Sequence, residues 1–212
     1  MSTAVKICGL SEPETLRAAC ENGARFVGFV FYPPSPRAVT IDTAYELARQ
    51  VPTGVRSVGL FVDPSDVFLD QVTGAVQLDM IQLHGNETPQ RITEIKQRTH
   101  MPVMKAIRVA SRDDLADLDA IERAADWILF DAKPAGADLP GGTGERFDWN
   151  ILKGLNFDKP WMLSGGLDAG NAAEALSTLS PTAVDISSGV ESTRGVKDAS
   201  KIKDFLDTLK NI

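Results

Sequence analysis

The amino-acid sequence predicts an α/β protein with a closed (β/α)8 architecture, a TIM barrel that spans residues 1–212 as a single domain. Eight short apolar runs recur at a spacing of roughly 25 residues, and a helical pattern follows each run. Most runs are continuous rather than alternating, which is typical of parallel strands buried on both faces. The length of 212 residues and the 43% hydrophobic content suffice for one such barrel. An open, doubly wound sheet is the alternative architecture.

Strands and helices are expected to alternate along the chain. The strands are predicted at residues 5–8, 26–31, 55–62, 80–83, 103–107, 127–131, 161–163 and 183–186. The helices are predicted at residues 11–21, 40–50, 63–74, 88–98, 111–120, 148–152, 171–176 and 199–209. Ser11 is the expected N-cap of the first helix, with Pro13 in the first turn and Glu14 at capping-box spacing. Asn171 is the expected cap of the helix that it begins.

The composition limits the possible classes of protein. A formal net charge of -7 argues against a nucleic-acid-binding surface, which needs a basic stripe. No apolar run approaches the ~18 residues of a membrane span, and the N-terminus lacks the pattern of a secretory signal. Cys8 and Cys20 give no disulfide framework, so a reducing compartment, the cytoplasm, is expected. The Gly-rich stretch from Ala135 to Glu145 is a candidate lid.

Groups with useful chemistry follow several of the predicted strands, and the carboxyl ends of the strands carry the active site in a TIM barrel. These groups are Cys8, Arg37, His84, Asp131, Ser164-Gly165-Gly166, Asp185 and Ser187-Ser188-Gly189. The two Gly- and Ser-rich exits on successive strands favour a phosphate site, because glycine lets backbone N–H groups approach an anion. The alternative is that these glycines only form tight turns.

Each remaining group has a structural interpretation beside the functional one. Cys8 has a chemical role or is a small core hydrophobe, and Asp131 has a catalytic task or caps the next segment. Arg37, held by a Pro-rich loop, suits a carboxylate or phosphate clamp, but a loop arginine is often simply solvated. His84 is a pocket group or a satisfied polar residue. With His100 as the only other histidine, no metal site is expected. No Gly-rich NAD fingerprint or Ser-His-acid pattern is present.

Six short motifs stand in order at the predicted strand exits. They are Lys6-Ile7-Cys8-Gly9, Ser35-Pro36-Arg37, Gly59-Leu60-Phe61-Val62, Gln82-Leu83-His84-Gly85, Ser164-Gly165-Gly166-Leu167 and Asp185-Ile186-Ser187-Ser188-Gly189-Val190-Glu191. In order and spacing this set resembles the phosphoribosylanthranilate isomerase family over nearly the whole chain. The segment Ser192-Thr193-Arg194-Gly195 departs from that pattern, in which a proline tends to precede the glycine.

The resemblance implies a cofactor-free Amadori rearrangement, the third step of tryptophan synthesis from chorismate, in which phosphoribosylanthranilate becomes carboxyphenylamino-deoxyribulose phosphate. By position, Cys8 would be the general base and Asp131 the general acid. Arg37 would hold the anthranilate carboxylate, Asp185 would meet a sugar hydroxyl, and His84 would line the pocket. The phosphate would be bound by Gly165, Gly166, Ser187, Ser188 and Gly189.

Two other functions stay open from the residues themselves. One is a different phosphosugar isomerase or lyase on the same barrel, and the other is a non-catalytic phosphosugar-binding barrel. A binding module needs only the Gly- and Ser-rich exits, whereas a catalyst needs Cys8 together with Asp131. In either case the expected partner is a small phosphorylated aminosugar, without nucleic acid or membrane, and the chain is expected to be a monomer or a homodimer.

Overall fold

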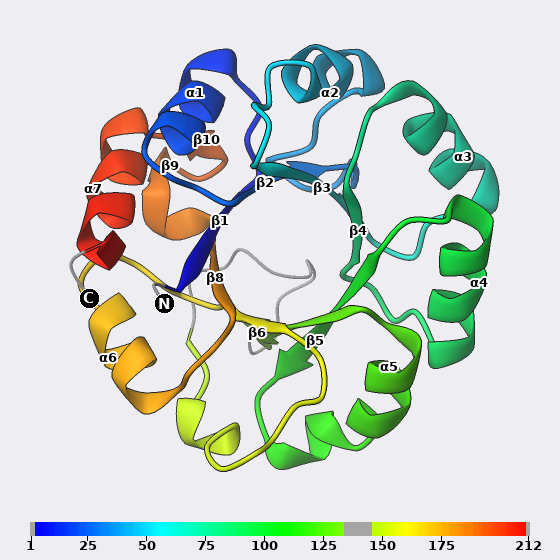
Figure 1. Ribbon diagram of the computed structural model, residues 1–212, viewed down its shortest axis with the longest axis vertical. Helices are drawn as coiled ribbons and strands as arrows, with labels where there is room; N and C mark the ends of the chain where they lie inside the picture. The colour runs from blue at the N-terminus through cyan, green and yellow to red at the C-terminus, as the bar shows by residue number, and fades with distance from the viewer. Residues whose placement is uncertain (1–2, 134–145, 211–212) are drawn as a thin grey trace.

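Eight parallel strands form a closed barrel in a computed structural model that describes residues 3–133 and 146–210. The strands are β1 (Ala4–Cys8), β2 (Phe26–Val30), β3 (Arg56–Phe61), β4 (Met80–Leu83), β5 (Val103–Val109), β6 (Trp127–Ala132), β7 (Trp161–Leu163) and β8 (Ala183–Ile186). They are ordered β1 to β8 around the ring (Figure 1), and β1 pairs with β8 through Val5 and Val184. This closure confirms the predicted (β/α)8 barrel and excludes the open sheet.

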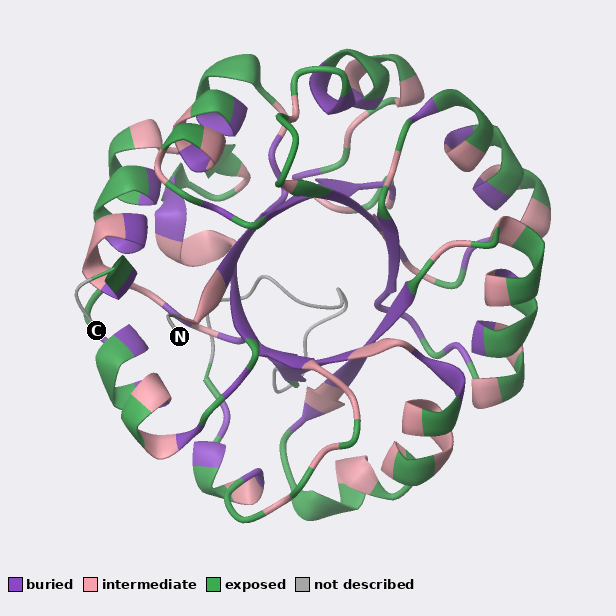
Figure 2. Ribbon diagram, in the orientation of Figure 1, coloured by how far each residue is buried: buried purple, intermediate pink, exposed green. Residues whose placement is uncertain are grey.

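Helices surround the barrel, with their exposed sides turned outward (Figure 2). The α-helices are α1 (Pro13–Glu21), α2 (Ile41–Ala48), α3 (Asp66–Ala75), α4 (Pro89–Thr99), α5 (Leu118–Ala124), α6 (Ala172–Thr178) and α7 (Ala199–Lys210). The short 3-10 helices are η1 (Arg112–Leu115), η2 (Trp149–Ile151) and η3 (Ser188–Val190). A two-stranded hairpin, β9 (Glu191–Thr193) with β10 (Val196–Lys197), follows β8. Within the described ranges, no helix combines the length and apolar character that a bilayer crossing requires.

Most predicted helix starts are confirmed, but the first cap is wrong. Glu12, not Ser11, occupies the N-cap position of α1, and its side chain makes no capping hydrogen bond. The reason is that Pro13 takes the first helical position, where its fixed φ and missing N–H are tolerated best. Asn171 does stand at the N-cap of α6, yet its side chain donates to the Gly166 carbonyl oxygen instead. Side-chain caps are formed for α2, α3 and α4 by Thr40, Ser65 and Thr88.

The predicted helix at residues 111–120 is also wrong, because the chain forms η1 and then α5 there. The carboxylate of Asp114 accepts the backbone N–H groups of Ala110 and Ser111, which ties the chain into a tight turn before α5 begins. The segment 148–152 contains only the single turn η2. The candidate lid from Ala135 to Glu145 lies outside the described residues.

The barrel interior contains an apolar cluster beneath the carboxyl ends of the strands. Its buried members are Phe26, Val58, Met80, Met104, Ala106, Leu129, Met162 and Ala183. Side chains two residues apart on a strand point to the same face. Counting by two from Met80 therefore gives Gln82 and His84, and counting by two from Leu129 gives Asp131. The same strands thus supply the apolar floor and the polar groups above it.

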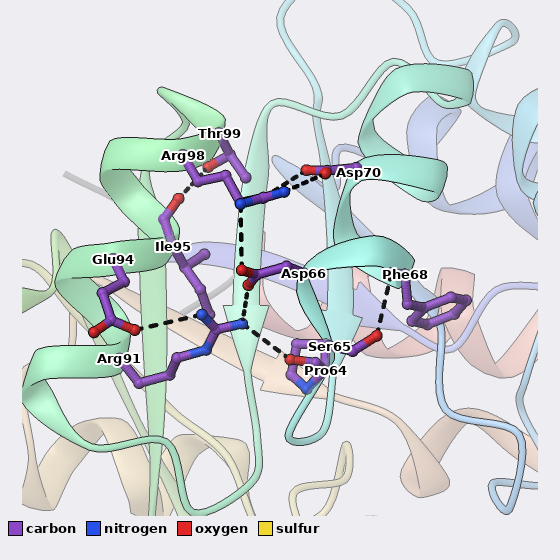
Figure 3. A network of polar contacts seen from close by, with 10 residues as sticks. All are labelled: Pro64, Ser65, Asp66, Phe68, Asp70, Arg91, Glu94, Ile95, Arg98 and Thr99. Carbon is purple, nitrogen blue, oxygen red and sulfur yellow. Dashed lines mark hydrogen bonds and ion pairs between the residues drawn. The ribbon is translucent and has the colours of Figure 1, made fainter.

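An ion-pair network joins α3 to α4 on the outside of the barrel (Figure 3). Arg91 donates to Asp66 at 2.6 Å, and Arg98 bridges Asp66, at 3.2 Å, and Asp70. Arg91 also lies 3.5 Å from Glu94 within its own helix. Asp70 and Arg98 are exposed and Asp66 is half-buried, so this network is screened by salt and orients the two helices more than it stabilises them.

Candidate active site

A pocket with about 600 Å³ of open space lies at the carboxyl ends of the barrel strands. Six of the predicted site residues line it: Cys8, Arg37, His84, Asp131, Asp185 and Ser187. The other four, Gly165, Gly166, Ser188 and Gly189, are not among the lining residues. In the described part of the chain, no group of three or more His, Cys, Asp or Glu side chains is arranged to hold a metal ion.

Cys8 ends β1 above a buried lysine. Lys6 is completely buried on the same face of the strand, and its Nζ donates to Asp185 Oδ1 at 2.8 Å. A Cβ on Gly28 would lie 3.0 Å from Cys8 Sγ and 3.2 Å from Lys6 Nζ, so this glycine makes room for both groups. The thiol therefore lies beside an ammonium group inside the barrel.

Burial and this ammonium group act on the thiol in opposite directions. Burial raises the pKa of Cys8 above its ordinary value, while the positive charge of Lys6 lowers it, and burial wins. Burial alone would lower the pKa of Lys6, but Asp185 and Cys8 together raise it above 10.5. Lys6 is thus a cation at neutral pH, and Asp185 is its counter-ion rather than a free carboxylate.

Asp131 lies within β6 and is held by a short hydrogen-bonded chain. Its Oδ2 is 3.1 Å from His84 Nε2, and its Oδ1 accepts the backbone N–H of Ala132 at 2.9 Å. The Nδ1 atom of His84 is 3.1 Å from Nε2 of Gln82, a completely buried side chain on β4. With the amide nitrogen of Gln82 facing the ring, Nδ1 accepts and Nε2–H donates to Asp131. His84 therefore orients the carboxyl group as well as lining the pocket.

Arg37 is buried against a second carboxylate. Its Nε and Nη2 atoms donate to Glu191 at 2.7 and 3.0 Å, and Glu191 also accepts Lys197 Nζ and the backbone N–H of Gly195. We name these four residues the Glu191 cluster. Burial would raise the pKa of Glu191, but the hydrogen bonds from Arg37 and Lys197 dominate and lower it to about 2. Two nitrogens of the predicted carboxylate clamp are therefore already engaged within the protein.

The loops after β7 and β8 touch each other, as the phosphate prediction requires. A Cβ on Gly189 would lie only 2.2 Å from the Leu167 carbonyl oxygen. Gly165 and Gly166 have positive φ angles of 88° and 60°, and a Cβ on Gly165 would meet the Ala132 backbone nitrogen at 2.6 Å. Glycine at these positions allows an approach of backbone segments that any side chain would prevent.

Several polar residues at the site were not predicted. Gln82 and Glu191 lie within the motifs quoted above, but only their neighbours were assigned roles. Lys6 could have been placed by its spacing of two from Cys8 on a strand. No sequence pattern marks Lys197. The hairpin of β9 and β10 brings it to the site, where its Nζ donates to Ser187 Oγ at 3.1 Å.

The fold and the pocket define a (β/α)8-barrel enzyme with an acid, a thiol and two glycine-lined exits at one end. The family model "N-(5'phosphoribosyl)anthranilate (PRA) isomerase" matches residues 5–208. The N-(5'-phosphoribosyl)anthranilate isomerase of Rhodospirillum centenum is 55% identical over 208 residues, which cover 97% of each chain. The chain therefore belongs to the phosphoribosylanthranilate isomerase family and is an isomerase of tryptophan biosynthesis.

Solved structures agree with this assignment. The phosphoribosyl anthranilate isomerase of Thermotoga maritima has a TM-score of 0.89 at 35% identity, covering 99% of this chain and 100% of that one. Another structure with the same name has a TM-score of 0.83 at 32% identity and covers 99% and 100%. It was solved in complex with reduced 1-(o-carboxyphenylamino)-1-deoxyribulose 5-phosphate.

Proposed function

We propose that the chain isomerises N-(5'-phosphoribosyl)anthranilate with Asp131 as general acid and Cys8 as general base. Asp131 gives a proton to the furanose ring oxygen as the bond from this oxygen to C1 breaks, which leaves an iminium at C1. Cys8 then takes the proton from C2, and the enolamine formed rearranges to the ketone. Atoms balance without any co-reactant: the former ring oxygen and C1 each gain a proton, whereas C2 and its hydroxyl each lose one. The substrate thus has no net change in protons, and Asp131 and Cys8 return to their starting states by proton exchange with water.

The observation that carries this proposal is the shared pocket. Cys8 and Asp131 come from β1 and β6, strands separated by β8 and β7 in the closed ring, and both line the same cavity. A sugar held between them presents one face to an acid and another to a base. The pair is also the feature that a phosphosugar-binding module would not need.

Each catalytic group needs the protonation state opposite to that of the other. Cys8 acts as a base only as a thiolate, and Lys6 is the group that favours this form against the effect of burial. Asp131 acts as an acid only when protonated. The substrate brings a phosphate and a carboxylate into the pocket, and nearby negative charge favours a protonated carboxyl group.

The phosphate is proposed to bind where the loops after β7 and β8 meet. Gly165, Gly166 and Gly189 provide backbone without side chains, and Ser187 and Ser188 provide backbone N–H donors at the start of η3. The Ser187 hydroxyl already donates to the Cys8 carbonyl oxygen at 3.1 Å. Lys197 adds a cation beside Ser187. Asp185 meets a sugar hydroxyl through Oδ2, since its Oδ1 is engaged by Lys6.

The test follows the loss of anthranilate fluorescence when purified protein meets freshly prepared phosphoribosylanthranilate. Wild type should convert the substrate, and Asp131→Asn should lose at least about 100-fold in kcat. Asp119→Asn, an exposed substitution of the same kind on α5, is the matched control and should behave as wild type. Wild-type turnover by Asp131→Asn would move the acid to another residue.

A further inference from the structure

A completely buried glutamine lies behind the acid and has no role in the mechanism above. The amide nitrogen of Gln82 is 3.1 Å from His84 Nδ1, and His84 Nε2 is 3.1 Å from Asp131 Oδ2. His84 and Asp131 line the pocket, whereas Gln82 is not among its lining residues. We propose that Gln82 is a positioning residue, which holds His84 in the Nε2–H tautomer and thereby keeps the acid proton of Asp131 available to the substrate. The inference rests on the proposed function and deepens its account of the acid.

The amide group of Gln82 is held in one orientation inside the barrel. The residue pairs in register with Leu60 on β3 and Met104 on β5, and its side chain is shielded from water. Among the residues described, its Oε1 atom has no hydrogen-bond partner. A buried carbonyl without a partner is less rare than a buried N–H group without one. Turning the amide over would take the NH2 group away from its acceptor, His84 Nδ1, so the observed orientation is favoured.

This orientation determines which nitrogen of His84 carries the proton. A neutral imidazole has one N–H group and one acceptor nitrogen. Because the NH2 group of Gln82 faces Nδ1, Nδ1 is the acceptor and Nε2 carries the proton. Nε2–H donates to Asp131 Oδ2 and cannot accept the acid proton. Without the amide, the opposite arrangement becomes accessible, in which Nδ1 is protonated and Asp131 donates its proton to His84 Nε2 instead of to the substrate.

The Nε2–H group also stabilises the charge that forms when Asp131 acts. As the carboxyl group gives its proton to the ring oxygen of the sugar, negative charge develops on both carboxyl oxygens. Oδ1 accepts the N–H of Ala132 at 2.9 Å, and Oδ2 faces His84. Hydrogen bonds to an ionised acceptor are stronger than those to a neutral one, so both bonds strengthen in the transition state. The opposite tautomer would place a lone pair against Oδ2 and remove one of these two donors.

A double-mutant cycle tests this role by turnover. Gln82→Met keeps an unbranched side chain but has no amide, so it should lower kcat about tenfold, the effect of one hydrogen bond to a charged group, and leave KM unchanged. His84→Gln places an N–H donor without tautomers beside Asp131, and in this background Gln82→Met should lower kcat less than about twofold. Gln97→Met, an exposed substitution on α4, is the control and should match wild type.

Nitrogen-15 NMR of the imidazole ring observes the tautomer directly and needs no turnover. The probe is Asp131→Asn, because its neutral amide stands in for the protonated acid and can donate or accept. In this variant His84 should be the Nε2–H tautomer, and adding Gln82→Met should produce a measurable Nδ1–H fraction. His100, the other histidine of the chain, is exposed at the end of α4 and is the internal control, whose signals should not change.

Three results would overturn the inference. Unchanged kcat in Gln82→Met, or an equal loss with and without His84→Gln, would show that Gln82 only fills the barrel. An Nδ1–H tautomer of His84 in Asp131→Asn would show that the amide has the opposite orientation, and this measurement needs no change at Gln82. Wild-type turnover by Asp131→Asn would instead refute the proposed acid, and the NMR comparison would keep its meaning.

Discussion

Replacing Lys6 with methionine tests the buried charges at the base of the pocket. Methionine keeps much of the lysine's volume but leaves Asp185, which is 5% exposed, without its cation. Removing one member of a buried ion pair costs about 3–5 kcal/mol, because the remaining charge stays desolvated. Lys6→Met should therefore lose this much unfolding free energy in urea titrations. This is a large part of the stability of an ordinary domain, about 5–15 kcal/mol.

The double variant Lys6→Met/Asp185→Leu distinguishes the loss of the ion pair from a change in core packing. It has no buried unpaired charge, so it should recover most of the stability that Lys6→Met loses. The exposed Lys203→Met is the control and should leave the unfolding curve unchanged. A loss below about 1 kcal/mol in Lys6→Met, as for a surface pair, would refute the reasoning. So would a double variant that is no more stable than the single one.

The same pair gives a definite pH dependence. The pKa of Lys6 is raised above 10.5 in the folded protein, so the contribution of the pair is complete below pH 10.5. It should be lost only as the pH rises through the folded value. The stability difference between wild type and the double variant should therefore be constant from neutral pH to 10.5 and decrease above it.

Three further predictions concern the thiol, the Glu191 cluster and the helix surface. Cys8→Ser should reduce kcat at least about 100-fold, whereas the control Cys20→Ser should stay active. Because burial raises the pKa of Cys8, the kcat/KM of wild type should still rise with pH near pH 9.0. A kcat/KM that is constant from neutral pH upward would contradict the role of Cys8 as base. Glu191→Gln removes a carboxylate whose pKa is lowered to about 2. The difference in unfolding free energy between wild type and this variant should therefore be complete above pH 4.5 and disappear as the pH falls toward 2. Acid unfolding followed by circular dichroism measures this difference. An unchanged acid transition would count against the cluster. Arg98→Met should lower the thermal midpoint slightly at low salt and not at about 1 M salt, where exposed charges are screened; a large, salt-independent decrease would disprove this view of the network.

The fold was predictable because the barrel repeats one local rule eight times. Continuous apolar runs such as Phe26–Val30 mark strands that are covered on both faces, and capping residues such as Thr88 mark the helices between them. The errors arose where two local signals competed. Ser11 is the better capping residue, but Pro13 determines where α1 begins, so Glu12 occupies the cap.

The positions of the site residues could be predicted more fully than their partners. Strand ends are visible in the sequence, which is why Cys8, His84 and Asp131 were expected at one end of the barrel. Their partners depend on closure of the ring. Glu191 lies 154 residues from Arg37 in the chain, and Asp185 lies 179 residues from Lys6. No periodicity relates such distant positions, so the engagement of Arg37 by a carboxylate appears only in three dimensions.

The apolar cluster inside the barrel has a kinetic consequence. Side chains such as Met80, Met104 and Leu129 fill the barrel below the polar groups, so among the described residues the pocket opens at one end. A ligand that enters by this opening must also leave by it. Product and substrate therefore cannot pass each other, and each turnover has to empty the pocket before the next begins. Added product should then raise the apparent KM and leave kcat unchanged.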